Sequence, residues 1–317
     1  MRVLVTGGSG LLGSFVVDDL LSHGHTVGVL DLKPPNQRAQ RVRYHGCSIL
    51  DVDAVVDAVA AGYDRVIQLA GIDDGIDATE YSFFSTNVQG AWNVLHACEL
   101  AGVEKVVLAS SCKAFEMDEV NPPQYLPVDE LHPLRATQAY SLSKELIERT
   151  AASFTRGAGL DTIVLRPTLI LRPVKAPEVV TALNLLGEDQ GFETGAAPYN
   201  PEWLPAVRTY VSSQDAAAAF VAAVTSDLKG HHVFIVSAPD TLGAVDTQQL
   251  MEQLYGERKP RVADEARYEA RPDASVLDTS AITRAIGWAP RDDWAAILAR
   301  VKKAIGGEAE KRAAAKL

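Results

Sequence analysis

The feature that most constrains the fold is a glycine-rich turn at the start of the chain. Residues 6–13 read TGGSGLLG and connect a short apolar strand to a helical stretch, Gly10–His23. Gly7 permits a tight turn, Gly10 lets the backbone approach a phosphate, and Gly13 lets the helix pack close to the strand. Because a helix N-terminus offers free N–H groups to an anion, the turn predicts a pyrophosphate-binding site.

Strand and helix signals alternate through the first half of the chain. The predicted strands are Arg2–Val5, Thr26–Asp31, Val42–His45, Arg65–Ala70, Lys105–Ser110 and Asp161–Leu165. The predicted helices are Gly10–His23, 52–59, Thr79–Ala101 and Ala139–Arg156. Strands separated by helices pair in parallel, and apolar strands without alternation are covered on both faces. We therefore expect an α/β fold, a Rossmann-type doubly wound parallel sheet.

Asp31 ends the second predicted strand, where a carboxylate can accept hydrogen bonds from the hydroxyls of an adenine ribose. The same charge repels a 2′-phosphate, since two unit charges about 4 Å apart cost about 4 kcal/mol at surface-like screening. A solvated aspartate at a strand end is the alternative interpretation. We predict NAD as the cofactor, although the preference over NADP is softened by Lys33, Arg38, Arg41 and Arg43.

The alternation of strand and helix signals becomes less regular after Arg166, where several prolines interrupt the sequence. We place an NAD-binding Rossmann domain at 1–172, with a return to the sheet near 207–236. Within that return, we predict a helix over Tyr210–Val224 and a strand over Val233–Val236. The smaller substrate-binding domain is assigned to 173–206 and 237–317.

Composition limits the partners. The 317 residues carry a net charge of −11, which argues against a nucleic acid or an anionic membrane because phosphate binding needs clustered Lys and Arg. The chain opens on a strand rather than a cleavable signal, and no apolar stretch is long enough to span a bilayer. Cys47, Cys98 and Cys112 lack the number and spacing of a disulfide framework or zinc site. We expect a cytoplasmic protein without a metal.

A tyrosine and a lysine four residues apart, Tyr140 and Lys144, open the predicted helix Ala139–Arg156. This spacing puts both side chains on one helix face, about 6 Å apart along the axis. A tyrosine with a pKa of roughly 10 is a poor base, and a neighbouring ammonium is expected to lower that pKa. Tyr140 can then remove a proton from an alcohol while hydride leaves for the cofactor.

A second tyrosine and lysine with the same spacing occur at residues 255–259. There, a glycine and a proline mark a helix end, so we do not predict an acid/base pair at that position. Tyr140 follows a strand that ends in Ser110 and Ser111. The carboxyl end of a parallel strand faces the ligand crevice, so a serine hydroxyl there can bond the reacting oxygen. A tyrosine that only packs in the helix is the alternative interpretation.

Together these motifs resemble the short-chain dehydrogenase/reductase superfamily and, within it, the extended NAD-dependent epimerase/dehydratase family. The resemblance covers most of the chain. It rests on residues 6–13, 64–71, Asn87, Gly90, Asn93, Ser111, Tyr140, Lys144, 165–167, 208–215 and 278–290. Gln68 and Gly71 replace the His and final Ala that are usual in the family, and the stretch 112–116 also diverges.

The resemblance implies a role for individual residues. The catalytic set is Ser111, Tyr140 and Lys144. The cofactor-binding residues are Gly7, Gly10, Leu11, Leu12, Asp31, Ile49, Leu69, Ala70, Gly71, Asn87, Tyr140 and Lys144. The substrate-binding residues are Ser111, Cys112, Lys113 and Arg208, although Cys112 as a packing residue and Lys113 as a solvated lysine are alternatives. A homodimer is implied by analogy, through pairing of Thr79–Ala101 and Ala139–Arg156 into a four-helix bundle.

Three functions remain open. The first is a sugar or nucleotide-sugar epimerase, in which NAD stays bound and hydride returns to the opposite face. The second is a net dehydrogenase or reductase of a non-nucleotide sugar, a sugar acid or a hydroxy ketone. The third is a non-catalytic NAD-binding regulator, the least favoured because a sensor needs no acid/base pair. A dehydratase is disfavoured, since Cys112 and Lys113 stand where dehydratases carry an Asp-Glu pair.

Arg208 and Leu169 point to different substrates. Arg208 matches an arginine that binds the diphosphate of nucleotide sugars in the family, and a planar guanidinium suits phosphate. An arginine at the surface or a domain interface is the alternative. Leu169 stands where nucleotide-sugar enzymes usually have a diphosphate-contacting Asn, and a leucine cannot bond phosphate. The sequence therefore favours epimerisation of a carbohydrate-like substrate only slightly.

Overall fold

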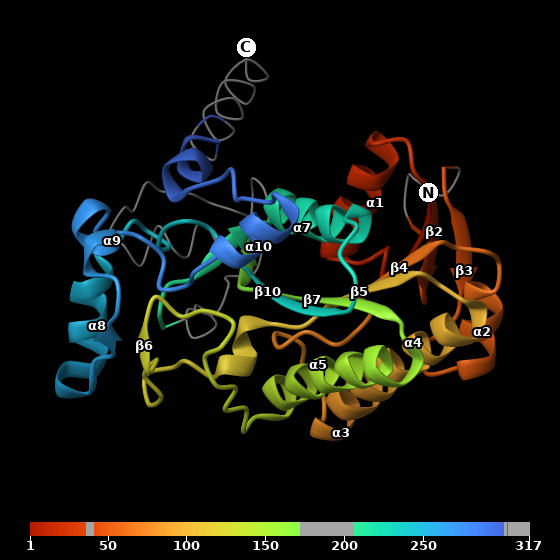
Figure 1. Ribbon diagram of the computed structural model, residues 1–317, viewed down its shortest axis with the longest axis horizontal. Helices are drawn as coiled ribbons and strands as arrows, with labels where there is room; N and C mark the ends of the chain where they lie inside the picture. Colours follow the sequence, from red (N-terminus) through yellow and green to blue (C-terminus); the bar gives the residue numbers. More distant parts are fainter. Residues whose placement is uncertain (36–40, 172–205, 301–302, 304–317) are drawn as a thin grey trace, which may run out of the picture.

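A seven-stranded sheet forms the centre of the protein, for which a computed structural model describes residues 1–35, 41–171, 206–300 and 303. All its strands are parallel, in the order β10-β7-β5-β4-β1-β2-β3 (Figure 1). The strands are β1 (Arg2–Thr6), β2 (Thr26–Asp31), β3 (Arg43–Gly46), β4 (Arg65–Gln68), β5 (Lys105–Ala109), β7 (Asp161–Pro167) and β10 (His231–Val236). The predicted parallel sheet is confirmed.

Helices cover both faces of this sheet (Figure 1). On one face lie α1 (Leu11–Ser22), α7 (Ser213–Thr225) and α10 (Ser280–Ile286). On the other lie α2 (Val52–Val59), α4 (Gly90–Ala101) and α5 (Ala139–Ala158). Each layer has its own hydrophobic core, which explains why the central strands are apolar on both sides. Within the described ranges, no helix is long and apolar enough to cross a membrane.

A third core lies beyond the carboxyl ends of β5 and β10. It is built by η2 (Cys112–Phe115), β6 (Tyr125–Leu126), α8 (Thr247–Tyr255), α9 (Glu265–Ala270) and the segments between them, including η4 (Gly256–Arg258) and β11 (Arg261–Val262). The predicted domain boundaries stay a prediction, because residues 172–205 lie outside the described part of the chain.

Two predicted helices differ in detail. The stretch Thr79–Ala101 is divided into α3 (Glu80–Phe83), the π-helical η1 (Phe84–Gln89) and α4. The stretch Tyr210–Val224 begins with a strand, β9 (Tyr210–Ser212), which pairs in parallel with β8 (Leu169–Leu171). The reason is local: the Ser212 side chain accepts the Asp215 N–H, which fixes the start of α7 after the strand.

Candidate active site

The glycine turn has the geometry predicted from its sequence. Gly7 has φ +68°, and a Cβ there would lie 2.7 Å from the Ala70 amide nitrogen. A Cβ on Gly13 would lie 2.0 Å from the Gly7 carbonyl oxygen, so α1 can approach the turn only with glycine at this position. Gly10 caps α1 without a side-chain hydrogen bond, which leaves helix N–H groups for an anion. These features fit the pyrophosphate of a dinucleotide.

Asp31 lies at the end of β2 beside this turn. Its Oδ2 accepts the Ser9 N–H at 3.0 Å, and its Oδ1 accepts the Lys33 N–H at 3.2 Å. The carboxylate therefore also holds the turn against β2, a second role that the spacing of residues did not reveal. Each oxygen keeps a lone pair for a ribose hydroxyl, because a carboxylate oxygen can accept two hydrogen bonds.

The residues after β4 line the opposite side of the turn. The Leu69 N–H donates to the Thr6 carbonyl at 3.2 Å, and the Ala70 N–H donates to the Thr6 hydroxyl at 3.2 Å. Gln68, which replaces the usual histidine, is buried, and its amide donates to the Ala70 carbonyl at 3.0 Å. The glutamine thus fixes the backbone of the predicted cofactor-binding residues.

Asn87 connects this loop to helix α5. Its Oδ1 accepts the Ile72 N–H at 2.7 Å, while its Nδ2 donates to the Ile72 carbonyl at 3.1 Å and to the Ser143 hydroxyl at 3.0 Å. Gly71 packs on the same amide, since a Cβ there would lie 2.9 Å from Asn87 Oδ1. Asn87 therefore holds backbone in place, and its predicted cofactor contact stays a prediction.

The remaining predicted cofactor-binding residues fall into two groups. Leu11 is exposed on the first turn of α1, and Leu12 beside it is partly buried. Ile49 is buried instead: its carbonyl accepts the Asn93 side chain at 2.9 Å, and its side chain packs on Gly90. Contacts of these residues with a cofactor stay predictions.

The structure brings Ser111, Tyr140 and Lys144 together at the carboxyl end of β5. Ser111 Oγ accepts the Lys113 N–H at 3.1 Å, and the Ser111 side chain lies near enough to Tyr140 to lower the pKa of its hydroxyl. Lys144 Nζ lies 5.4 Å from the centroid of the Tyr140 ring and donates to the Ala109 carbonyl at 3.1 Å. All three side chains are buried. Two hydroxyls and an ammonium at the same edge of the sheet as the glycine turn can support proton transfer coupled to hydride transfer.

The electrostatics of this group differ from the sequence prediction. Burial raises the pKa of Tyr140, the carboxylate of Asp73 raises it further, and the nearby Ser111 hydroxyl opposes the rise. Burial also lowers the pKa of Lys144 to about 8, against the attraction of Asp73. The expected lowering of the tyrosine pKa is therefore wrong for this structure, because burial and the negative charge of Asp73 both raise it.

The predicted substrate-binding residues have different environments. The Cys112 thiol is buried in the third core, contacts the Arg166 carbonyl at 3.1 Å, and has a pKa raised by that burial. Lys113 is half-exposed and pairs with Asp74 at 3.1 Å. Arg208 is partly exposed just before β9 and has φ +54°. The packing interpretation of Cys112 fits this structure, whereas Lys113 and Arg208 are at least partly exposed.

A buried ion pair between helix α5 and strand β7 lies next to the site, and the sequence analysis did not identify it. Glu148 accepts Arg166 Nε at 2.8 Å and Arg166 Nη2 at 2.7 Å, and it also accepts the Ser110 hydroxyl at 2.6 Å. Ser110 thus points to the ion pair rather than to Tyr140. The signal was present, because Tyr140, Lys144 and Glu148 repeat every four residues along one face of α5.

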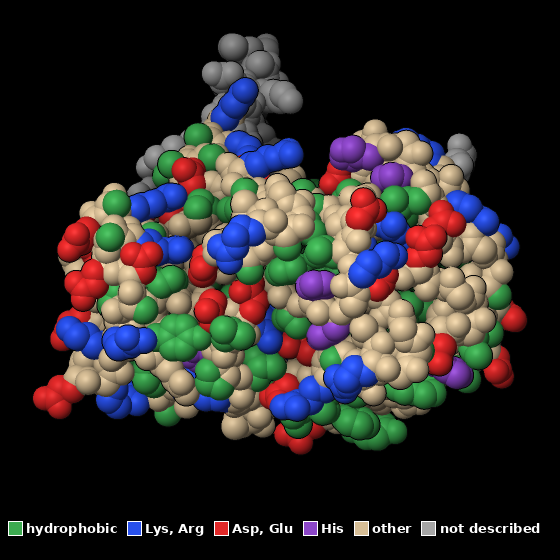
Figure 2. Space-filling model, viewed as in Figure 1, with side chains coloured by type: hydrophobic (Ala, Val, Ile, Leu, Met, Phe, Trp, Pro, Cys, Tyr) green, Lys and Arg blue, Asp and Glu red, His purple; other side chains and the backbone are tan. Residues whose placement is uncertain are grey.

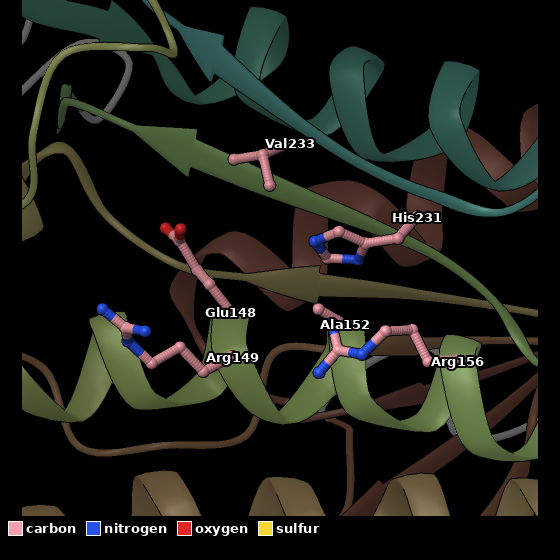
Figure 3. Close-up of a pocket in the computed structure, with 6 residues that line it drawn as sticks. All are labelled: Glu148, Arg149, Ala152, Arg156, His231 and Val233. Carbon is pink, nitrogen blue, oxygen red and sulfur yellow. The ribbon is translucent and has the colours of Figure 1, made fainter.

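A separate hollow of about 320 Å³ lies between α5 and β10 (Figure 3). Its lining consists of Glu148, Arg149, Ala152, Arg156, His231 and Val233. Figure 3 shows Arg149 and Arg156 on the helix, opposite His231 on the strand. No predicted site residue lines this hollow, so it is not the candidate active site.

The chain is similar to known proteins over most of its length. The NAD dependent epimerase/dehydratase family matches residues 3–236. A UDP-glucose 4-epimerase of Corynebacterium glutamicum is 25% identical over 92% of this chain and 91% of the relative. A dihydroflavonol 4-reductase of Zea mays is 29% identical over 62% of this chain and 59% of the relative. The structure of a Thermus thermophilus UDP-glucose 4-epimerase in complex with NAD is 27% identical, with a TM-score of 0.66 over 92% of this chain and 95% of that one.

Proposed function

Since the chain belongs to the NAD-dependent epimerase/dehydratase family and is an NAD-dependent enzyme, we propose that it transfers hydride at a secondary alcohol or ketone of a carbohydrate-like substrate. The preferred reaction is epimerisation of a sugar or nucleotide sugar. The observation that carries this proposal is the cluster of Ser111, Tyr140 and Lys144 at the same edge of the sheet as the N-terminus of α1, which has no side-chain cap.

NAD, when bound, supplies the acceptor and donor of hydride. Its pyrophosphate would lie against the free amides of α1, and its adenine ribose against Asp31. Lys144 uses one N–H on the Ala109 carbonyl, and an ammonium has three donors, so two remain for the other ribose.

Proton transfer is proposed for Tyr140. The Ser111 side chain is near enough to affect the pKa of Tyr140, so we expect a substrate oxygen that binds one hydroxyl to lie within reach of the other. During oxidation, Tyr140 takes the proton of the substrate hydroxyl. During reduction, it returns that proton to the carbonyl oxygen, and Ser111 orients the same oxygen throughout.

Two observations support a nucleotide sugar as substrate. The UDP-glucose 4-epimerase from Corynebacterium matches nearly the whole chain, and the partly exposed Arg208 lies close to β9. A net dehydrogenase or reductase is the second candidate. It is supported by the similarity to dihydroflavonol 4-reductase and by Leu169, which places an apolar side chain where a diphosphate would need a donor.

A homodimer is proposed through the helices around α4 and α5. Their exposed apolar side chains are Tyr81, Phe84, Trp92, Leu100 and Leu142. Figure 2 shows hydrophobic side chains along the lower edge of the molecule, over α3 and α5. Light scattering tests this: we expect a native dimer that becomes monomeric in Trp92→Glu, and a monomeric native chain would exclude the proposal.

The reaction is tested by incubating the protein with NAD and separate nucleotide sugars, free sugars, sugar acids and hydroxy ketones. NADH absorbance and isomer composition are followed in the same samples. Isomer change without NADH supports epimerisation, whereas accumulation of NADH supports the net dehydrogenase. Absence of reaction with every compound, while NAD is bound, would contradict both proposed reactions.

A further inference from the structure

The hollow between α5 and β10 brings together three side chains that can carry positive charge. Arg149 and Arg156 lie on α5 on either side of Ala152, and His231 lies opposite them on β10 (Figure 3). Because the alanine side chain is short, a space of about 320 Å³ remains between the helix and the strand. The position was not predicted from the sequence, since only the fold brings these two elements together.

The negative charge inside this hollow is already neutralised. Among its described lining residues, the single carboxylate belongs to Glu148. That carboxylate is buried and accepts two hydrogen bonds from Arg166, at 2.8 and 2.7 Å, and one from the Ser110 hydroxyl at 2.6 Å. The buried pair carries no net charge, so the other ionisable groups give the hollow a positive character.

These groups keep donors that the protein does not use. Arg156 forms no hydrogen bond or ion pair within the described ranges. Arg149 pairs with Glu145 one turn earlier, at 3.1 and 2.8 Å, but its side chain is 73% exposed, and an exposed pair of this kind contributes little. His231 bonds the Thr162 hydroxyl through Nδ1 at 2.8 Å. Its Nε2 has no partner in the part of the chain that the structure describes.

This donor set fits a phosphate group. A guanidinium is planar and always charged, and it binds phosphate oxygens through pairs of N–H groups. The two arginines are seven residues apart, about 10 Å along the helix, and their long side chains can close on a ligand from both ends of the hollow. The volume is at the lower end of the roughly 300–1,000 Å³ of small-molecule sites, which leaves room for a small organic group beside the partly buried Val233.

We propose that the hollow between α5 and β10 is a second ligand site, which binds the phosphate group of a small phosphate ester or free phosphate. Arg156 and His231 hold the phosphate oxygens, and Arg149 joins them by exchanging Glu145 for the ligand. The site is separate from the glycine turn, where the pyrophosphate of NAD is proposed to bind.

The site is also separate from the proposed dimer surface. On α5, Phe154 packs against Trp92 of α4, with ring centroids 6.1 Å apart. Ala152 precedes Phe154 by two residues and therefore lies on the opposite side of the helix. Figure 2 shows histidine side chains at the surface between β10 and α5, with basic side chains over α5. A ligand in the hollow would leave the α4 side of α5 open to a partner.

The experiment is calorimetric titration of the NAD-saturated protein with glycerol phosphate, inorganic phosphate and glycerol, in a buffer without other phosphate or sulfate. NAD is present so that phosphate cannot enter the glycine turn. We expect glycerol phosphate to bind and glycerol not to bind. Tighter binding of glycerol phosphate than of inorganic phosphate would assign the site to an ester, and the reverse order would assign it to the free ion.

Two variants should change this affinity in opposite directions. Arg156→Met should weaken it at least about tenfold, since a hydrogen bond to a charged group contributes about that factor. Glu145→Gln should strengthen it, because this change releases Arg149 and removes a negative charge. Arg284→Met is the matched control, since it removes another exposed arginine from the last turn of a helix, α10, which covers the other face of the sheet.

A resonance of the His231 ring locates the ligand. The signal is assigned by its loss in His231→Asn, whose side-chain amide can still bond the Thr162 hydroxyl. We expect this signal to shift when glycerol phosphate is added to the NAD-saturated native chain, and to stay unchanged at the same concentration in Arg156→Met.

Absence of binding to the native chain would overturn the proposal. Equal affinities of the native chain and Arg156→Met would also overturn it, as would an equal loss in Arg284→Met. Binding that disappears when NAD is added would assign the phosphate to the glycine turn and contradict a second site. The titrations require no turnover, so their outcome is independent of the proposed reaction.

Discussion

A buried lysine lies at each end of strand β5, and the two lysines have different surroundings. At the amino end, Lys105 donates to the Ser226 carbonyl and lies 3.3 Å from the Ser226 hydroxyl, at the end of helix α7. At the carboxyl end, Lys144 reaches from α5 to the last residue of the strand, Ala109. Burial lowers the pKa of both lysines.

The difference shows how a structural cation is distinguished from a functional one. Lys105 and its neighbour Arg65 both donate to carbonyls at the end of α7, where cations also favour the helix dipole. Lys144 offsets its burial with a single protein hydrogen bond among the described residues and keeps donors for a ligand. A buried charge left incompletely paired is a sign of function, because it lowers stability unless something else selects for it.

The largest effect is expected from Tyr140→Phe, at the carboxyl end. Removing the hydroxyl eliminates the only proposed proton donor and acceptor, so kcat should fall by about 10³-fold or more. NAD binding should be nearly unchanged, because the ring remains beside Lys144. Turnover is measured on the compound that reacts with the native chain. Full residual activity would remove Tyr140 from the mechanism.

Lys144→Met tests the comparison at the carboxyl end of β5, because we expect this variant to be less active but more stable than the native chain. The pKa of Lys144 is about 8 in the folded chain and near 10.5 without burial, so the unfolded state binds more protons between these values. The ammonium therefore costs stability at neutral pH, by at most about 3 kcal/mol, and this cost disappears as the pH rises towards 10.5.

The variant should thus lose activity about 10²-fold or more yet gain about 1–3 kcal/mol of unfolding free energy at pH 7. Urea unfolding without NAD at neutral and alkaline pH measures this gain, which should shrink at the higher pH. A less stable variant at neutral pH would show that the ammonium is a net stabiliser and that the two lysines are alike.

Much of the fold could be predicted because it follows from local patterns. Gly7 and Gly13 are required by backbone geometry that any strand–turn–helix unit of this kind shares, and the apolar strands follow from burial on both faces. Strand β9 was missed because it is three residues long and exists only through pairing with Leu169–Leu171. No periodicity can indicate a partner that distant.

The part of the candidate site that could be predicted is the part on helix α5, where its residues recur every four positions. Tyr140 and Lys144 lie on one helix face, and their spacing alone places them together. Asp73 belongs to another strand's loop, and its position depends on the Asn87 bonds to Ile72. The pKa of Tyr140 was misjudged for the same reason, since burial and a carboxylate from another element are tertiary effects.

Asp31→Ser changes a second residue at the carboxyl edge of the sheet, and we expect a smaller effect on the kinetics than for the two α5 variants. Loss of the carboxylate removes repulsion of a 2′-phosphate, so the ratio of kcat/KM for NADP to that for NAD should rise by about 10–100-fold. Kinetics with both cofactors measure the ratio. Some loss of activity with NAD is also expected, because Asp31 accepts the Ser9 N–H of the glycine turn. An unchanged ratio would show that Asp31 only holds the turn.

The smallest effect is expected from Lys105→Met, the counterpart of Lys144→Met at the amino end. Arg65 Nη1 still donates to the Ser226 carbonyl at 3.0 Å, so the end of α7 keeps a partner. The unfolding free energy should fall by about 1 kcal/mol, the net worth of a hydrogen bond, while kcat and NAD binding stay at native values. Urea unfolding and turnover assays check both. A loss of activity without a loss of stability would mean that the amino edge also serves the reaction, and that pairing does not distinguish the two lysines.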